Sequence, residues 1–254
     1  MSNKDMRFNQ YCFVVLLGFC LTKVDAVELP NAAKQTLTQA FEETGLKTSL
    51  ISSLTVLPPN SKEEPFYHVE IGAFLFHFAD NGTFLFEPTQ KSLETRIKET
   101  LNALDEKHFI DFNSNQKKRF KIIVLTDVTC PYSLALHREI EWLNAEGVEI
   151  RYLPLPSGDE ESLSFKKMHA VWCNQDRQNA FEKAIQNQRF RLEDCQTFAL
   201  SAGNALGNVL NVKGTPTLLF ENGTVSTGYS SAVDMLDHLE KGTPLESEGY
   251  SAKE

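Results

Sequence analysis

The sequence predicts a mixed fold in which a small α+β unit is followed by a linker helix and a larger α/β unit. The α/β unit is indicated by residues 121–127, an apolar run rich in β-branched residues that leads into a helical spacing starting at Pro131. The α+β unit is indicated by phenylalanines that alternate over 74–78 and 84–86, on either side of an Asp-Asn-Gly turn. We therefore expect two units within one chain.

The first 26 residues have the pattern of a secretory signal peptide. Lys4 and Arg7 precede an uncharged apolar core over 11–21, and small residues stand before a cleavage point after Ala26. About 11 apolar residues are too few to cross a bilayer, which needs about 20. We therefore expect export, cleavage and no membrane insertion afterwards.

The chain is acidic, with a formal net charge of −9 at pH 7. The predicted signal peptide is itself net positive, so its removal leaves the remainder slightly more acidic. The sequence has no basic patch and no glycine-rich phosphate loop, which argues against nucleic-acid binding and phosphoryl transfer. No cofactor is indicated, and the acidity favours solubility.

Residues 27–88 are predicted to form the small α+β unit. Leu37 and Phe41 mark a short helix, a strand is expected in the stretch that ends at 57, and Pro58-Pro59 interrupts it. The aromatic hairpin completes the unit. A sheet of about 60 residues buries little apolar surface alone and presents an edge strand, so pairing with a second copy is a reasonable expectation.

An amphipathic linker helix is predicted within residues 89–110. Leu93, Ile97, Leu101 and Leu104 fall at helical spacing, with charged residues between them. In a dimer, two such helices would hold the larger units apart and leave a cleft between them. The larger unit is expected over 111–245, and the tail over 246–254 is expected to be disordered.

Cys130 is predicted to lie at a strand-to-helix junction. Pro131 suits the first helical position, and Leu134 to Leu143 continue the helical spacing. Unpaired N–H groups and the dipole at a helix start favour the thiolate, the nucleophilic form of cysteine. We therefore expect a reactive thiol rather than a small buried apolar side chain.

The stretch Cys130-Pro131-Tyr132-Ser133 has the shape of a thioredoxin-type redox motif with serine in place of the second cysteine. Such a motif retains the chemistry that one sulfur can do. Ser133 could still donate a hydrogen bond to the thiolate and help to stabilise it.

Three cysteines remain after the predicted cleavage, namely Cys130, Cys173 and Cys195. An odd number in an oxidising compartment implies one disulfide and one free thiol. Cys173 and Cys195 are the natural pair, and a bridge that clamps two helices and closes a loop of about 20 residues would contribute about 3 kcal/mol. Two alternatives are pairing of Cys130 with either of the others and a zinc site, although no metal-ligand spacing is present.

Pro216 precedes an apolar run over 217–220 that reads as a strand. A proline there is awkward in a central strand, but it fits if the bond between Thr215 and Pro216 is cis and faces the thiol. The backbone of Thr215 would then be free to pair with an extended substrate chain. Asn222-Gly223 makes the hairpin turn that follows.

These motifs together resemble the DsbC/DsbG family of dimeric periplasmic protein disulfide isomerases, over nearly the whole predicted mature sequence. The segments that carry the resemblance are 125–132, 148–156, 171–173, 180–181, Cys195, 214–216, 222–224 and 228–229. The resemblance implies a thioredoxin fold with a helical insertion at about 159–207, Cys130 as the attacking thiol, a structural disulfide between Cys173 and Cys195, and a cis proline at Pro216. It also implies a periplasmic homodimer, formed through residues 27–88, that acts on unfolded or wrongly cross-linked exported proteins.

Ser133 departs from the two-cysteine pattern of that family. Donating a disulfide, or escaping from a client by internal attack, needs both sulfurs, whereas isomerisation needs one thiolate that attacks and later leaves unchanged. Our leading hypothesis is a single-thiol disulfide isomerase. The alternatives are a dimeric chaperone in which Cys130 only tethers clients and, third, a reductase of small mixed disulfides. The sequence identifies neither the clients nor the reductant.

Other titratable residues suggest only supporting roles. Asp127 is expected beneath the motif at the end of its strand, where helix N–H groups could satisfy it. His137 is expected to be a packed or solvated helix residue rather than a partner of the thiol. The remaining histidines show no ligand spacing, so no metal site is predicted; they are His68, His77, His108, His169 and His238.

Overall fold

The computed structural model of the chain describes residues 29–59, 66–113 and 116–245. The predicted signal peptide at 1–26 and the predicted tail at 246–254 lie outside the described residues. Within the described ranges, none of the helices combines the length and the apolar character needed to cross a membrane.

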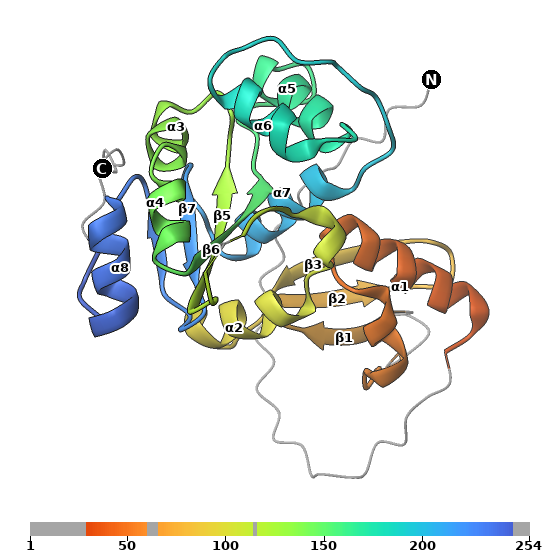
Figure 1. Cartoon of the computed structure of the whole chain (residues 1–254). Helices are drawn as coiled ribbons and strands as arrows, with labels where there is room; N and C mark the ends of the chain where they lie inside the picture. The colour runs from red at the N-terminus through yellow and green to blue at the C-terminus, as the bar shows by residue number, and fades with distance from the viewer. Residues whose placement is uncertain (1–28, 60–65, 114–115, 246–254) are drawn as a thin grey trace, which may run out of the picture.

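The first unit is a helix lying on a three-stranded antiparallel sheet (Figure 1). Its elements are α1 (Asn31–Thr44), the 3-10 helix η1 (Thr48–Ser53), β1 (Tyr67–Ile71), β2 (Phe74–Phe78) and β3 (Phe84–Pro88). The predicted aromatic hairpin is present, because Phe76 lies opposite Phe86 and Phe78 opposite Phe84. Alternate side chains of β2 are buried against α1, where the rings of Phe41 and Phe76 lie 5.4 Å apart.

The strand predicted in the stretch that ends at residue 57 is wrong. The chain instead forms η1, and only a single bridge between Leu57 and His68 pairs it with β1. Within η1, Ile51 alone is buried. The segment therefore places one side chain in the core, whereas a strand would bury every second side chain. A short apolar run can satisfy either geometry.

The second unit contains a five-stranded sheet with the order β4-β6-β5-β7-β8. Its strands are β4 (Ile110–Phe112), β5 (Phe120–Thr126), β6 (Val148–Pro154), β7 (Thr217–Phe220) and β8 (Val225–Thr227). β5 and β6 are parallel, and the other neighbours are antiparallel. The central strand β5 is buried on both faces, as predicted from its continuous apolar run.

Helices cover both faces of this sheet. On one face Ile122 and Val124 of β5 pack in a core with α3 (Pro131–His137), α4 (Ile140–Ala145) and α8 (Ala232–Lys241). On the other face Ile123 and Leu125 pack with α7 (Ala199–Val209). The predicted thioredoxin fold with added helices is therefore confirmed, and the two opposite faces of β5 belong to two separate cores.

The insertion is shorter than the predicted range of about 159–207. Its helices are α5 (Leu163–Trp172) and α6 (Arg177–Ile185), which pack on each other at one end of the sheet (Figure 1). α7 belongs to the sheet layer instead, because it packs along β6. Its apolar positions are therefore explained by the sheet and not by the insertion.

The linker helix α2 (Leu93–Ala103) is shorter than the predicted range of 89–110. It begins at Ser92, whose hydroxyl accepts a hydrogen bond from the backbone N–H of Thr95, and it ends before Leu104, which is extended. Residues 106–112 form a short 3-10 helix, η2 (Glu106–His108), and β4 instead.

The first unit packs directly on the second. α1 lies against α7, and one apolar core contains Phe41 of the first unit together with Leu125 and Leu206 of the second. A backbone hydrogen bond of 2.8 Å from Lys47 N to Ala103 O also ties the first unit to the end of α2. Within one chain, α2 therefore runs beside a packed junction and does not act as a bare spacer.

Candidate functional site

Cys130 lies where the sequence places it, between β5 and α3. It occupies the position that precedes the helix, and Pro131 fills the first helical position. Its carbonyl oxygen accepts from Leu134 N at 3.1 Å, and its own N–H donates to Asp127 O at 3.0 Å. The side chain is partly exposed, and Cys130 is a free cysteine. The thiol therefore stands at a helix start with access to solvent.

The second part of the site is the turn before β7. The peptide bond between Thr215 and Pro216 is cis, and the Cys130 thiol donates a hydrogen bond of 3.1 Å to the carbonyl oxygen of Thr215. The carbonyl of Pro216 is occupied, because it accepts from Gly228 N at 2.8 Å. The chain thus presents one backbone carbonyl, that of Thr215, to the sulfur.

Ser133 does not behave as the sequence suggested. Its side chain is fully buried, and its hydroxyl oxygen has no hydrogen-bond partner among the described residues, so it makes no bond to Cys130. The second position of α3 points outward instead, since Tyr132 is 39% exposed. The motif therefore offers one accessible sulfur beside one exposed aromatic ring.

Asp127 fixes the loop that leads into Cys130. One carboxylate oxygen accepts from the backbone N–H and the hydroxyl of Thr129, both at 2.8 Å. The other accepts from the N–H and hydroxyl of Ser157, at 2.9 and 2.7 Å, and from the hydroxyl of Ser164 at 2.7 Å. Burial raises the pKa of Asp127, but these hydrogen bonds outweigh burial, and the net pKa is lowered from 3.8.

Three supporting residues escaped the sequence reasoning. Ser157 and Ser164 tie the start of the insertion to Asp127, and the Sδ atom of Met168 accepts from Val128 N at 3.3 Å. They lie about 30 to 40 residues after the loop that they hold. No spacing in the sequence connects serines and a methionine at such separations, so only the fold could reveal them.

Cys173 and Cys195 form a disulfide with an S–S distance of 2.07 Å. Cys173 follows the end of α5, whereas Cys195 lies in the irregular segment before α7. The bridge therefore ties a helix end to a stretch without regular structure, and the expectation that it clamps two helices is corrected. Two further contacts hold that stretch, since Asn174 Nδ2 donates to Arg191 O at 3.0 Å and His169 Nε2 lies 3.1 Å from Cys195 O.

His137 is a packed residue, in line with the more favoured of its two interpretations. Its ring lies among those of Phe112, Tyr152 and Phe181, and its Nδ1 lies 3.2 Å from the hydroxyl of Tyr152. Burial lowers the pKa of His137 to about 4, so the ring is neutral at pH 7. It is therefore not a charged partner of the thiol.

Two other histidines meet across the small sheet. The Nδ1 atoms of His68 and His77 lie 2.7 Å apart between β1 and β2, a pairing that the sequence spacing did not indicate. Nevertheless, the described residues contain no group of three or more histidine, cysteine or acidic side chains arranged to hold a metal ion.

A free thiol at the start of a helix, beside a cis proline that opens the next strand, defines a thioredoxin-type site. The chain belongs to the thioredoxin-like family, because the model of the thioredoxin-like domain matches residues 106–243. This range contains the whole site.

Relatives point to one branch of that family. The chain is similar to the thiol:disulfide interchange protein DsbC of Escherichia coli K12, with 36% identity over 141 residues, which are 56% of this chain and 58% of the relative. DsbC of Dickeya dadantii is 33% identical over 144 residues, which cover 57% of this chain and 59% of the relative. The chain thus matches less than two thirds of the length of these relatives.

A solved structure is similar in its general shape. The disulfide interchange protein of Neisseria gonorrhoeae is 24% identical, with a TM-score of 0.48, over 54% of this chain and 97% of that one.

Proposed function

We propose that this protein is a single-thiol disulfide isomerase of exported proteins. The observation that carries the proposal is the hydrogen bond of 3.1 Å between Cys130 Sγ and the carbonyl of Thr215, beside the cis proline and without a second sulfur at Ser133. The similarity of this part of the chain to thiol:disulfide interchange proteins supports it.

The reaction uses Cys130 twice. Its thiolate attacks one sulfur of a client disulfide, the other client sulfur leaves as a thiolate, and a mixed disulfide forms. A client thiolate then attacks either the mixed disulfide, which releases Cys130, or another client disulfide, which changes the pairing before release. The number of disulfides and thiols is the same before and after, so no net oxidant or reductant is consumed.

The carbonyl of Thr215 changes partner during this cycle. In the free protein it accepts from the thiol, but a mixed disulfide has no S–H, so the carbonyl becomes available to a client N–H. Pro216 cannot compete, because its carbonyl remains bonded to Gly228. The site thus offers a backbone acceptor at the moment when a client is attached.

The wider setting is part of the same proposal. We infer a periplasmic homodimer that pairs through the first unit and receives unfolded or wrongly cross-linked exported proteins. Support comes from exposed apolar side chains in and beside that unit, since Leu57, Leu85 and Leu93 are 46%, 50% and 44% exposed. β3 is an edge strand of its sheet, which suits pairing with another chain.

The experiment is the refolding of a scrambled protein with several disulfides. The chain without residues 1–26 is compared with its Cys130→Ala and Ser133→Cys variants, under a fixed glutathione buffer. We expect the unaltered chain to restore client activity and Cys130→Ala to fall to the rate of buffer alone. Ser133→Cys should add the ability to release stalled mixed disulfides, seen as fewer covalent complexes on a non-reducing gel.

Two results would redirect the proposal. If Cys130→Ala works as well as the unaltered chain, no sulfur chemistry is involved, and the chaperone hypothesis gains the support. If only Ser133→Cys is active, the natural chain has lost isomerase activity and retains client capture.

A further inference from the structure

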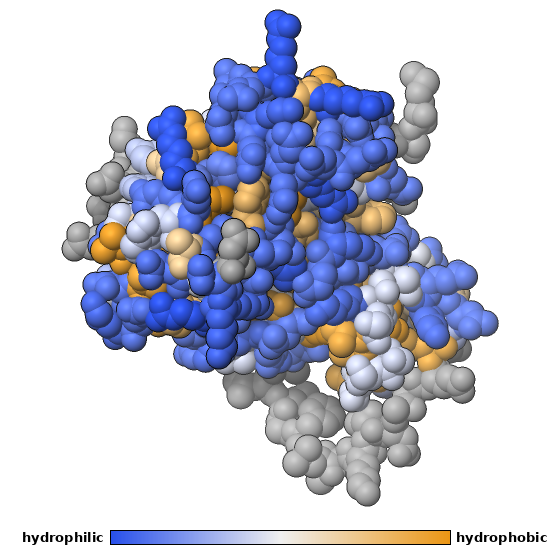
Figure 2. All heavy atoms as spheres, viewed as in Figure 1, coloured by the Kyte–Doolittle hydropathy of each residue, from blue (hydrophilic) through white to orange (hydrophobic). Residues whose placement is uncertain are grey.

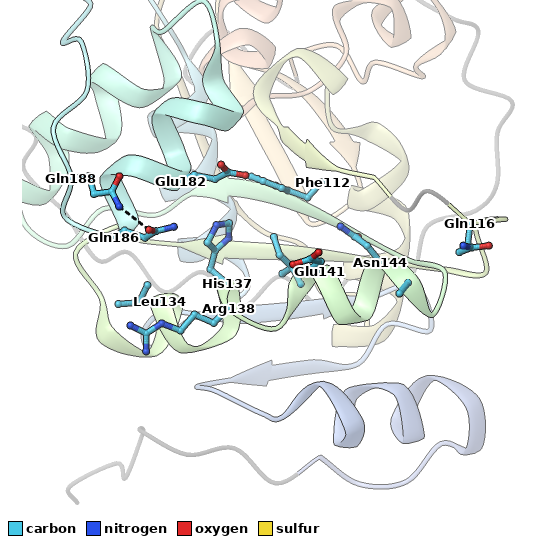
Figure 3. Close-up of a pocket in the computed structure, with 12 residues that line it drawn as sticks. Phe112, Gln116, Leu134, His137, Arg138, Glu141, Asn144, Glu182, Gln186 and Gln188 are labelled. Atoms are coloured by element: carbon cyan, nitrogen blue, oxygen red, sulfur yellow. Dashed lines mark hydrogen bonds between the residues drawn. The ribbon is translucent and has the colours of Figure 1, made fainter.

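A pocket lies between α3 and α4 on one side and α6 on the other (Figure 3). Its volume is about 900 Å³. This is at the upper end of the range of about 300–1,000 Å³ that is usual for ligand sites. It is lined by Leu134 and Arg138 of α3, which is the helix that starts at Cys130. The pocket thus lies beside the thiol site without containing it.

The floor of the pocket contains a buried polar side chain, the imidazole of His137. His137 is only 9% exposed, lines the pocket and extends from α3 toward its centre in Figure 3. Its Nδ1 contacts the hydroxyl of Tyr152, while its Nε2 has no hydrogen-bond partner among the described residues. One nitrogen of this ring is held by Tyr152, and the other is left available to a ligand in the pocket.

The tautomer of His137 follows from Tyr152. That side chain is fully buried, and Nδ1 of His137 is the partner that its hydroxyl has among the described residues. If Nδ1 carried the proton, the tyrosine O–H would be left buried without an acceptor, at a cost of about 1–3 kcal/mol. The hydroxyl therefore donates to Nδ1, and Nε2 carries the proton. The pocket floor offers a neutral N–H donor.

The walls disfavour an anionic ligand. The lining contains one guanidinium, that of Arg138, and two carboxylates, those of Glu141 and Glu182, and the mouth on the α6 side carries the amides of Gln186 and Gln188, which bond to each other at 3.0 Å. The carboxylates outnumber the guanidinium, and the visible surface in Figure 2 is mostly hydrophilic, with hydrophobic residues in small separate groups. Amide groups and a neutral donor match uncharged amides best.

We propose that this pocket binds an extended stretch of client main chain, with a client carbonyl accepting from His137 Nε2–H. The inference rests on the proposed function, because it supplies the client. His137 lies about 10 Å along the α3 axis from Cys130, at a rise of about 1.5 Å per residue. An extended chain covers that distance in about three residues, so a client held at Cys130 reaches the pocket.

The test uses exchange at Cys130 with two neutral probes. Cys130 is first converted to its mixed disulfide with glutathione, and a thiol probe then displaces glutathione, so one disulfide breaks and one forms. The short probe is cysteine with both ends blocked. The long probe carries five glycine, serine or asparagine residues on each side of the cysteine. We expect the equilibrium constant to be about five- to tenfold higher for the long probe, which is the value of one net hydrogen bond.

Variants locate the origin of that difference. The double variant His137→Phe, Tyr152→Phe leaves no unpaired hydroxyl. In this variant the exchange equilibrium constant of the long probe should fall to that of the short probe. Gln186→Ala should weaken the long probe in the same direction, whereas Gln90→Ala, an exposed glutamine outside the pocket, should not. If the double variant does not fold, the test is the ¹⁵N NMR signal of His137 Nε2 in the unaltered chain. Attachment of the long probe should shift this signal.

The outcomes separate the two proposals. Equal exchange equilibrium constants for the two probes, or a ¹⁵N signal of His137 that does not shift, would refute client binding in the pocket. The proposed chemistry of Cys130 would be unaffected by either result. Absence of any exchange at Cys130 with either probe would overturn the proposed function itself, and the client site with it.

Discussion

The carboxylate of Asp127 makes most of the polar contacts around the candidate site. It accepts five hydrogen bonds that join the Cys130 loop to the start of the insertion. In Asp127→Asn, an amide nitrogen would face the N–H and the hydroxyls that now donate to the second oxygen. We expect a loss of about 1–3 kcal/mol in the free energy of unfolding at pH 7, and slower reaction of Cys130 with small disulfides.

The stabilising contribution of Asp127 should decrease as the pH falls. Because the folded-state pKa of Asp127 is lowered from 3.8, its stabilising contribution is complete above about pH 5 and is lost as the pH falls through the folded-state value. Urea unfolding should therefore show a large difference between Asp127→Asn and the parent at pH 7, and a smaller one at pH 3. Asp159→Asn is the control, because it is exposed and its acceptor for Glu161 N survives as an amide oxygen. An unchanged difference at both pH values would contradict the argument.

Some residues of the candidate site could be placed from the sequence and others could not. Cys130, Thr215 and Pro216 could be placed from the sequence because each occupies a local pattern, namely a helix start or a proline before a strand. The hydroxyl of Ser133 and the pair of His137 with Tyr152 could not, since their surroundings depend on side chains from other elements. A buried serine hydroxyl without a hydrogen-bond partner lowers the stability of the fold, and no sequence pattern predicts it.

Helix α7 approaches the sheet closely at Gly203. A Cβ atom added at Gly203 would lie 1.6 Å from the backbone oxygen of Pro154 at the end of β6, which no side-chain movement can relieve. We expect Gly203→Ala to lower the free energy of unfolding by about 1–3 kcal/mol or more, because α7 must move away from β6.

Gly207, one turn further along α7, is the matched control. A Cβ there would meet the tip of Leu155 at 3.1 Å and Val212 Cβ at 4.0 Å, both of them side chains, and alanine is favoured over glycine within a helix by about 1 kcal/mol. Gly207→Ala should therefore be neutral or mildly stabilising in urea unfolding. Equal behaviour of the two variants would show that the contact with Pro154 does not limit the packing of α7.

The elements themselves were predictable to different degrees. The buried strand β5, the helix start at Pro131 and the aromatic hairpin follow from continuous or alternating apolar residues, and all three are present. The helical spacing after Cys130 runs on without a break, yet the chain divides it into α3 and α4. α7 resembled part of the insertion because an apolar helix gives no sign of which layer it joins.

The two units share one apolar core within the chain. The sequence predicted the units but not their contact, because Phe41 and Leu206 are brought together only by the path of the chain between them. One consequence is that the buried face of α1 packs on both α7 and its own sheet, so we expect a second copy to meet the first unit at the edge of that sheet. Leu85 on β3 is half exposed there.

The proposed dimer can be tested at that edge. Leu85→Lys places a charge on the exposed edge strand, where it would have to be buried against the second copy, so we expect the dimer to separate into monomers. Light scattering after size-exclusion chromatography measures the molar mass directly, and circular dichroism reports whether the fold is kept. Leu192→Lys is the control, because Leu192 is also exposed but lies in the irregular segment of the second unit. It should remain dimeric, and a parent chain that is already monomeric would refute pairing through the first unit altogether.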